Sequence, residues 1–235
     1  YGVYIEGGGS GDPQIISPVI QDNTFASNAN ITSTSYPVFI FTRDDQLSID
    51  GTIAGNTGEG NGWNGIAIQG NITGTTRLAV NADLPYLLSN LIVHAGQTLT
   101  YDPGVVAKLA GSGTITPLTV RGSLLANGTV DQPVVFTSRY DDAYGGDTDN
   151  GAMVAAKGDW SQIAIDGGSA VLNYTIVRYG GDDGGSDDGL IEVTNSGSLT
   201  ATNSTFSHSD GTGVYADYES GVIAFSLTGS TIAEN

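Results

Sequence analysis

One unit recurs along this chain, and it constrains the fold more than any other feature of the sequence. The unit opens with a small residue, Thr and an apolar residue, and runs through polar residues to Asn or Asp. It closes with an aromatic residue or Gly before an apolar triplet. It occupies residues 23–28 and 36–40, and it returns at residues 204–209 and 213–216. Repeats of about 20–25 residues with this composition predict a solenoid, in which each unit forms one coil that stacks on its neighbours.

The unit is interrupted at both ends of the sequence. Residues 230–235 form a first half, and residues 1–5 form a second half. The chain begins at Tyr1, with neither a basic leader nor a long apolar run. We therefore expect either that a leader has been removed or that this chain is a segment of a longer protein.

The residues between the repeats indicate short strands and turns. Apolar clusters of three to five residues alternate with Gly, Asn, Asp, Ser and Thr, which favour turns, and no apolar stripe of helical period lasts more than a turn. The chain has 35 Gly, no Cys and a formal net charge of −18. These values exclude a disulfide-stapled domain, and the 7 Lys and Arg residues argue against a nucleic-acid-binding protein.

Coils of three short strands, with Asn and Thr at the corners and Val, Ile and Leu inside, predict an all-β fold. We expect a parallel β-helix of about 8–10 coils that is open at both ends. Asn residues can adopt left-handed turn conformations, and identical residues can stack as ladders from coil to coil. A β-sandwich is the alternative for strands at this spacing.

Several segments resemble a known family of modules. Residues 84–88, 91–109, 118–129 and 133–138, followed by an Asp/Gly loop and Gly158-Asp159-Trp160, resemble right-handed parallel β-helix modules of large secreted bacterial surface proteins of the adhesin-like and S-layer-like repeat types. The resemblance covers about residues 84–181. It implies a right-handed parallel β-helix. The same fold occurs in carbohydrate-active proteins, so the resemblance says more about architecture than about activity.

The resemblance also predicts how the chain is divided. In such modules the segment at residues 84–93 begins a new helix section. We therefore expect residues 1–80 to be the C-terminal coils of a preceding module, and residues 81–235 to be the start and body of the next, within one continuous solenoid.

Two acidic stretches are candidate calcium sites. Carboxylate and carbonyl oxygens at two-residue spacing suit Ca²⁺, which takes 6–8 oxygen ligands, and several Asp side chains without a neighbouring Lys repel one another unless a cation or water screens them. A solvated, solubilising loop is the alternative. The candidate ligands are Asp141, Asp142, Asp147, Asp149 and Asn150 in one loop, and Asp182, Asp183, Asp187 and Asp188 in the other.

An enzyme is the rival interpretation, because many proteins with this fold cleave polysaccharides. A lyase needs a Lys or Arg base. The candidate bases are Lys108, Lys157, Arg121, Arg139 and Arg178. Arg178 is the best placed of them, because Asp182 and Asp183 follow it closely. A hydrolase needs two carboxylates on one face of the coils, a pair that 25 acidic residues supply easily by accident. The net charge also repels an anionic polymer.

The aromatic residues and histidines carry weaker signals. Trp63, Trp160, Tyr140 and Tyr144 could stack on a sugar, although a large aromatic residue such as Trp160 more often packs inside a fold. We expect structural roles for both histidines, His94 and His208. Ser207, His208 and Asp210 lie too close in sequence to converge as a catalytic triad.

Together these features predict an extracellular structural protein at the cell surface: a repeating segment of a fibre, stalk or surface layer, with Ca²⁺ as a candidate cofactor and no catalytic residues. The expected partner is a further copy of the chain, joined head-to-tail in tandem or as a separate molecule, and a cell-surface glycan is a second candidate. We expect neither a nucleic-acid partner nor membrane insertion. The alternative is a carbohydrate-active or carbohydrate-binding β-helix. The expected assembly interface consists of Tyr1, Val3, Tyr4, Ile5, Thr231, Ile232 and Asn235.

Overall fold

The structure is a computed structural model that describes residues 1–7, 15–28, 35–42, 46–111, 113, 115–151, 153–182, 184, 189–217 and 221–235. All regular elements in these residues are β-strands. Every strand pairing among them is parallel.

The strands form one large sheet, one of intermediate size and three small ones. The large sheet has 13 strands: β1 (Val3–Gly7), β5 (Val38–Thr42), β9 (Ile66–Ile72), β11 (Tyr86–Val93), β13 (Val106–Leu109), β14 (Leu118–Val120), β16 (Val134–Ser138), β17 (Ile163–Asp166), β19 (Thr175–Arg178), β20 (Gly189–Thr194), β22 (Thr205–Ser207), β23 (Thr212–Ala216) and β25 (Thr231–Ala233). The second sheet has six strands: β10 (Thr76–Leu78), β12 (Thr98–Tyr101), β15 (Ser123–Asn127), β18 (Ser169–Asn173), β21 (Ser198–Thr202) and β24 (Ala224–Thr228). The two-stranded sheets pair β2 (Ile15–Ile16) with β6 (Gln46–Leu47), β3 (Ile20–Gln21) with β7 (Ile53–Ala54), and β4 (Thr24–Ala26) with β8 (Thr57–Glu59).

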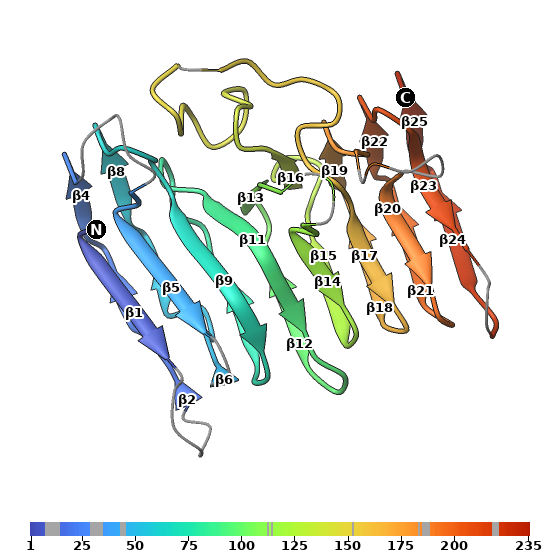
Figure 1. Cartoon of the computed structure of the whole chain (residues 1–235), viewed down its shortest axis with the longest axis horizontal. Coiled ribbons are helices and arrows are strands. Elements are labelled where there is room, and N and C mark those ends of the chain that lie inside the picture. The colour runs from blue at the N-terminus through green and yellow to red at the C-terminus, as the bar shows by residue number, and fades with distance from the viewer. Residues whose placement is uncertain are drawn as a thin grey trace.

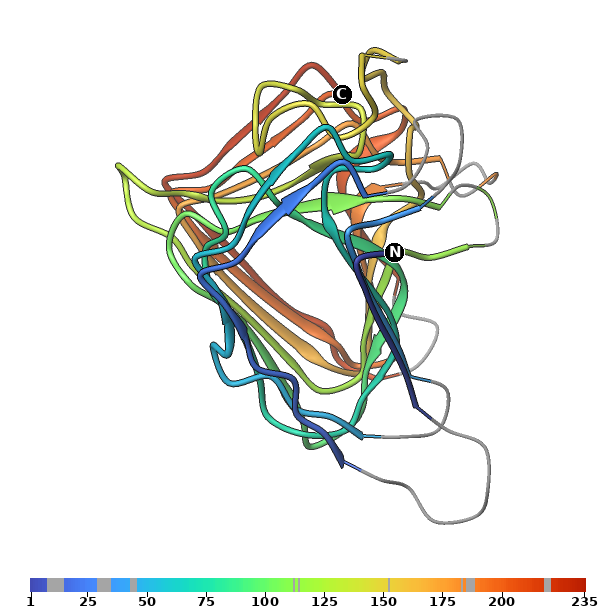
Figure 2. The ribbon, with the colours of Figure 1, turned by 90° about the vertical axis from the view of Figure 1, so that its left-hand side faces the viewer.

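Neighbouring strands of one sheet are separated in sequence by one full coil, so each coil is one layer of a parallel β-helix. The strands β1, β5, β9, β11, β14, β17, β20 and β23 mark eight successive layers. Figure 1 shows these layers in chain order from one end of the molecule to the other, and Figure 2, along the long axis, shows them superimposed around a common centre. The predicted all-β parallel β-helix is confirmed, and the sandwich is excluded.

The large sheet divides at β11. This strand pairs with β9 along both of its halves. Its first half then pairs with β13 and its second half with β14. From this layer on, the β13–β16–β19–β22–β25 face and the β14–β17–β20–β23 face are separate and meet at a corner of the coil. The strands before and after residues 80 and 81 belong to one hydrogen-bonded sheet, since β9 pairs with β11. The division into two modules at this point stays a prediction.

The core is built from columns of apolar side chains. Alternate residues of a strand point to opposite faces, so stacked strands place the inward residues of successive layers above one another. In the six-stranded sheet, Leu99, Leu124, Ala170 and Leu199 form one such column and are all at most 1% exposed. The next member, Phe225, lies in the last layer and is 48% exposed. The column is therefore covered wherever a further layer follows it.

Four seven-residue segments turn the chain in the same way at the corners, and we call them the corner segments: residues 22–28, 55–61, 203–209 and 229–235. In each, the first and sixth residues have positive φ, and the second and seventh are Asn or Ser. The positive-φ pairs are Asp22 and Ser27, Gly55 and Gly60, Asn203 and His208, and Gly229 and Glu234.

Hydrogen bonds between consecutive corner segments hold the layers in register. The side chains at the second and seventh positions of the later segment each accept a hydrogen bond from a backbone nitrogen of the earlier segment. The side chain at the seventh position also donates to a backbone oxygen of the earlier segment. Between segments 22–28 and 55–61 these bonds are Asn23 N to Asn56 Oδ1 (3.1 Å), Thr57 N to Asn23 O (2.9 Å), Asn28 N to Asn61 Oδ1 (2.9 Å) and Asn61 Nδ2 to Phe25 O (2.8 Å).

The same four bonds recur at the other end of the molecule. Between segments 203–209 and 229–235 they are Ser204 N to Ser230 Oγ (3.1 Å), Thr231 N to Ser204 O (2.8 Å), Ser209 N to Asn235 Oδ1 (3.0 Å) and Asn235 Nδ2 to Phe206 O (3.4 Å). The predicted ladder is therefore present. In the corner segments, however, the left-handed residues are the neighbours of the ladder residues, such as Asp22 and Ser27, and not the ladder residues themselves.

Candidate functional site

The longest connection at the divided corner joins β16 to β17 and carries the first acidic stretch. It folds back over earlier layers (the yellow segment in Figure 1). Asn150 Nδ2 donates to the carbonyl oxygens of Asn61 and Gly62, at 3.0 and 2.8 Å, and Asn64 N donates to Thr148 O at 2.9 Å. Asn150 therefore anchors this loop to the second corner segment.

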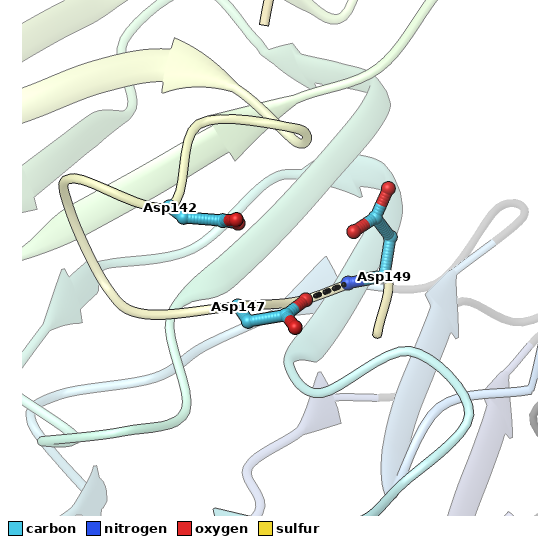
Figure 3. A group of neighbouring side chains, drawn as sticks. All are labelled: Asp142, Asp147 and Asp149. Carbon is cyan, nitrogen blue, oxygen red and sulfur yellow. Dashed lines mark hydrogen bonds between the residues drawn. The ribbon is translucent and has the colours of Figure 1, made fainter. Parts of the chain in front are cut away.

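Three of the predicted calcium ligands come together in this loop. Each of Asp142, Asp147 and Asp149 offers a carboxylate oxygen within 4.8 Å of the others, and Figure 3 shows the three side chains around one space. Asp147 Oδ1 also accepts from the backbone nitrogens of Asp149 and Gly151, both at 3.0 Å. We call these three carboxylates the acidic group.

A lysine lies beneath the loop, although none is near it in sequence. Lys108 has no exposed surface, and its Nζ donates to Gly146 O at 2.6 Å and to Thr148 Oγ1 at 3.1 Å. Burial lowers the pKa of Lys108 to about 8, against the opposing effect of Asp142, Asp141, Asp147 and Asp149. The expectation that no Lys screens these carboxylates is therefore wrong. A lone Lys in the apolar run of residues 105–109 is the sequence signal that points to a partner.

Asp141 is not part of the acidic group. Both of its carboxylate oxygens accept from Arg178, at 2.8 Å from Nε and 2.6 Å from an Nη atom, and its side chain is only 4% exposed. The Arg178 guanidinium also lies 4.7 Å from the ring centre of Tyr144 and 4.8 Å from that of Tyr179. Burial works against its charge, but the bonds to Asp141 outweigh burial and raise the pKa of Arg178. This arginine holds the loop to β19.

The second acidic stretch falls mostly outside the described residues. Asp183, Asp187 and Asp188 belong to that part of the chain. Asp182 is described, and its backbone links neighbouring segments: its nitrogen donates to Trp160 O and its oxygen accepts from Gly113 N. The structure does not group its carboxylate with those of Asp142, Asp147 and Asp149.

The aromatic and histidine candidates are built into the fold. Trp160 has no exposed surface and donates from Nε1 to Arg178 O at 3.1 Å. Trp63 and Tyr140 are half-buried, with the Arg139 guanidinium packed against both rings. His94 Nε2 is 2.9 Å from Asn71 Oδ1, and His208 Nε2 is 2.6 Å from a carboxylate oxygen of Glu234. Trp160 cannot stack on a sugar, and both histidines contact residues of neighbouring layers.

A polar groove, which the sequence did not single out, runs along the outer face of β14, β17 and β20 and reaches the residue after β23. Its volume is about 460 Å³, and its lining includes Arg121, Gln162, Asp166, Glu192 and Asp217. Asp166 accepts from Asn195 at 2.6 Å and from Arg121 at 2.9 Å, and these bonds lower the pKa of its carboxyl. Glu192 accepts from Gln162 at 3.1 Å.

The predicted assembly residues lie in the first and last layers. Tyr1, Tyr4 and Ile232 are 55%, 47% and 51% exposed. Val3 and Ile5 are partly buried against the core, and Thr231 is exposed. Asn235 reaches back to the preceding corner segment.

Comparison with known proteins adds one finding. A search of curated proteins and a search of solved structures each find no match to this chain. Among the described residues there is no helix long and apolar enough to cross a membrane. The pectate-lyase-like β-helix domain family matches residues 70–211, more than half of the chain. The parallel coils described above are the architecture that this description names, and the chain belongs to the family of pectate-lyase-like β-helix domains.

Proposed function

We propose that this chain is a structural segment of an extended β-helix, in a fibre, stalk or surface layer outside the cell. The supporting observation is that the first and last layers are each covered on one side only. Val3 and Ile5 in the first layer, and Val214 and Leu227 in the last, pack against the core while staying partly exposed. Among the described strands, β1 pairs only with β5, and β23, β24 and β25 each pair only with the preceding layer.

Such ends favour further stacking. An open strand edge presents backbone donors and acceptors that recruit another strand, and a covering layer would also bury the exposed ends of the apolar columns. The covering layer is a further copy of this chain, in tandem or as a separate molecule. The chemistry-bearing side chains fit this role, since Lys108 and Arg178 are used to hold the coils and their loop together.

Sedimentation velocity over a hundredfold range of concentration, with negative-stain electron microscopy of the same samples, tests this function. We expect end-to-end oligomers that lengthen with concentration. Particles that stay at the mass of one chain over the whole range would contradict non-covalent stacking.

A second candidate function is glycan binding in the polar groove, which the family assignment favours. Asp166 pairs with Thr194, and Glu192 pairs with Ala164, so the two carboxylates occur on adjacent strands two residues apart. Strand spacing and rise place their Cα atoms about 8 Å apart, and both side chains line the groove. Sites that cleave glycosidic bonds hold two carboxyl groups about 5–9.5 Å apart, a separation that side chains at this Cα distance can reach. A screen of neutral and uronate polysaccharides for binding and for new reducing ends tests this. We expect Asp166→Asn with Glu192→Gln to abolish any signal, and the exposed Asp131→Asn to preserve it.

We also propose that the acidic group binds one Ca²⁺. Three carboxylates supply hard oxygen ligands, while Lys108 beneath them offsets part of their charge, so we expect weak binding. Isothermal titration of Ca²⁺ into EDTA-treated protein, with Asp142→Asn plus Asp147→Asn as the comparison, measures it. Equal heats for the two proteins, or no heat for either, would contradict the site.

A further inference from the structure

We propose that the corner segment at residues 22–28 of one copy stacks directly on the corner segment at residues 229–235 of a second copy. This proposal rests on the structural role above and specifies its partner and its register. The partner is a second copy of this chain, because the first and last layers carry the same sequence unit. The first layer contains Gly2-Val3-Tyr4 and residues 23–28, and the last contains Gly213-Val214-Tyr215 and residues 230–235.

The backbone supports this register. Asp22 and Ser27 have φ values of 56° and 55°, and Gly229 and Glu234, at the same positions of the last corner segment, have 61° and 59°. The two segments therefore have the same left-handed residues five positions apart. Each already stacks on another corner segment within its own chain by the same four hydrogen bonds.

The interior ladder shows what the first layer would gain. Asn56 Nδ2 donates to Asn81 Oδ1 in the following layer, to Ala54 O in its own strand and to Ile20 O in the preceding layer. Asn23 Nδ2 makes the first two kinds of bond, to Asn56 Oδ1 and to Gln21 O. A preceding layer supplied by a second copy would offer a third acceptor, which the two N–H groups of this amide would share as those of Asn56 do.

Applied between copies, the pattern gives a definite set of bonds. They are Ser230 N to Asn23 Oδ1, Thr24 N to Ser230 O, Asn235 N to Asn28 Oδ1, and Asn28 Nδ2 to Ile232 O. Side-chain hydrogen bonds of this kind fix register rather than add much affinity, so burial of the core must supply the rest.

The same stack would also bring apolar residues of the two end layers together. Val214 pairs with Ile191 in the layer below it, and Val3 pairs with Val38 in the layer above it. Each therefore has a strand neighbour on one side within its own chain, and the stack would place Val3 on the open side of Val214. Ile232 pairs with Phe206 and is 51% exposed, whereas Phe206, one layer further in, has no exposed surface. Phe25 of the second copy would cover Ile232 as Ile232 covers Phe206.

The charges at this corner are compatible with stacking. Glu234 lies at the sixth position of its segment, where the second copy supplies Ser27, so no like charges meet there. The net charge of −18 on each copy opposes approach at longer range, and salt screens that repulsion over about 8 Å at physiological ionic strength. Stacking should therefore strengthen as salt is added.

A disulfide placed across the proposed contact tests the register, and the chain has no Cys of its own to interfere. Thr24 pairs with Thr57 and Thr231 pairs with Thr205, and both threonines are exposed. In the proposed stack they are direct neighbours at about 4.8 Å between Cα atoms, within disulfide range. The test protein is Thr24→Cys with Thr231→Cys. The matched control is Thr24→Cys with Thr228→Cys, because Thr228 lies on β24, on another face of the coil.

After mild oxidation we expect a series of covalent multimers from the test protein on non-reducing gels, at least tenfold more than from the control, with matching circular dichroism spectra. Two results would overturn the register and leave the structural role standing. One is equal cross-linking of the test and control proteins. The other is a test protein that does not cross-link although it still sediments as oligomers under reducing conditions. A wild-type chain that never associates would overturn both.

Discussion

Two arginine–aspartate pairs show how strongly burial changes the contribution of a single residue to the stability of the fold. Arg178 and Asp141 form a two-point contact with side chains 17% and 4% exposed, whereas Arg121 and Asp166 are 50% and 28% exposed. Removing one partner of a buried pair leaves an uncompensated charge in a low-dielectric environment. An exposed pair is screened by water and salt.

We expect Arg178→Leu to lower the free energy of unfolding by about 3–5 kcal/mol. The matched variant Arg121→Leu should change it by about 0–1 kcal/mol. Urea unfolding followed by circular dichroism compares the two. Losses of equal size would show that Asp141 is solvated rather than buried.

Lys108 gives a second prediction at this scale, in the pH dependence of stability. Its pKa is about 8 in the folded chain, against 10.5 for a lysine in water. Between these pH values the unfolded chain holds the proton and the folded chain does not, so stability rises with pH. The penalty for burying the charge is complete below pH 8 and relieved above it. The gain over this window is about 3 kcal/mol.

The measurement is the difference in unfolding free energy between the wild type and Lys108→Met at several pH values from 7 to about 10. We expect this difference to shift in favour of the wild type as pH rises. Lys157→Met, which removes an exposed lysine, is the control. A difference that stays constant with pH would mean that Lys108 is not desolvated.

At the scale of elements, the corner segments hold successive layers in register. Asn56 has no exposed surface, and its side chain bonds to the layers on both sides. Asn56→Ala leaves the buried Ile20 oxygen and the part-buried Asn23 nitrogen and Ala54 oxygen without this partner, and a buried group that loses its partner costs about 1–3 kcal/mol. We expect a loss of at least about 2 kcal/mol by urea unfolding, and little change for the exposed Asn127→Ala. A loss below 0.5 kcal/mol, on the order of a surface change, would show that the ladder is dispensable.

The sequence predicts elements well where side chains repeat with the coil. The unit at residues 23–28 and 204–209 is enough to predict stacked coils with Asn ladders, because its period reports the layer directly. The acidic loop was predicted only in part. Asp142, Asp147 and Asp149 are close in sequence and also lie close together in space. Asp141 instead forms an ion pair with Arg178, which is 37 residues away in the sequence. Lys108 and the polar groove depend on which strands stack, and local sequence does not contain that information.

For the whole molecule, stacking of this kind makes the chain one length of a continuous β-helix. The eight layers at about 4.8 Å each give about 38 Å per copy along the axis. The long dimension in Figure 1 is thus the direction in which the assembly grows. In this arrangement the polar groove and the acidic loop repeat at the same interval along the side of the assembly.

The most direct test is the axial repeat of the assembled protein, measured by cryo-electron microscopy of concentrated wild-type protein at physiological salt. Head-to-tail stacking predicts filaments with a β-strand spacing of about 4.8 Å along the axis and a repeat of about 38 Å. In these filaments β1 of one copy lies next to β23 of the preceding copy. Particles of a single copy, or copies packed side by side with both end layers open to solvent, would contradict it.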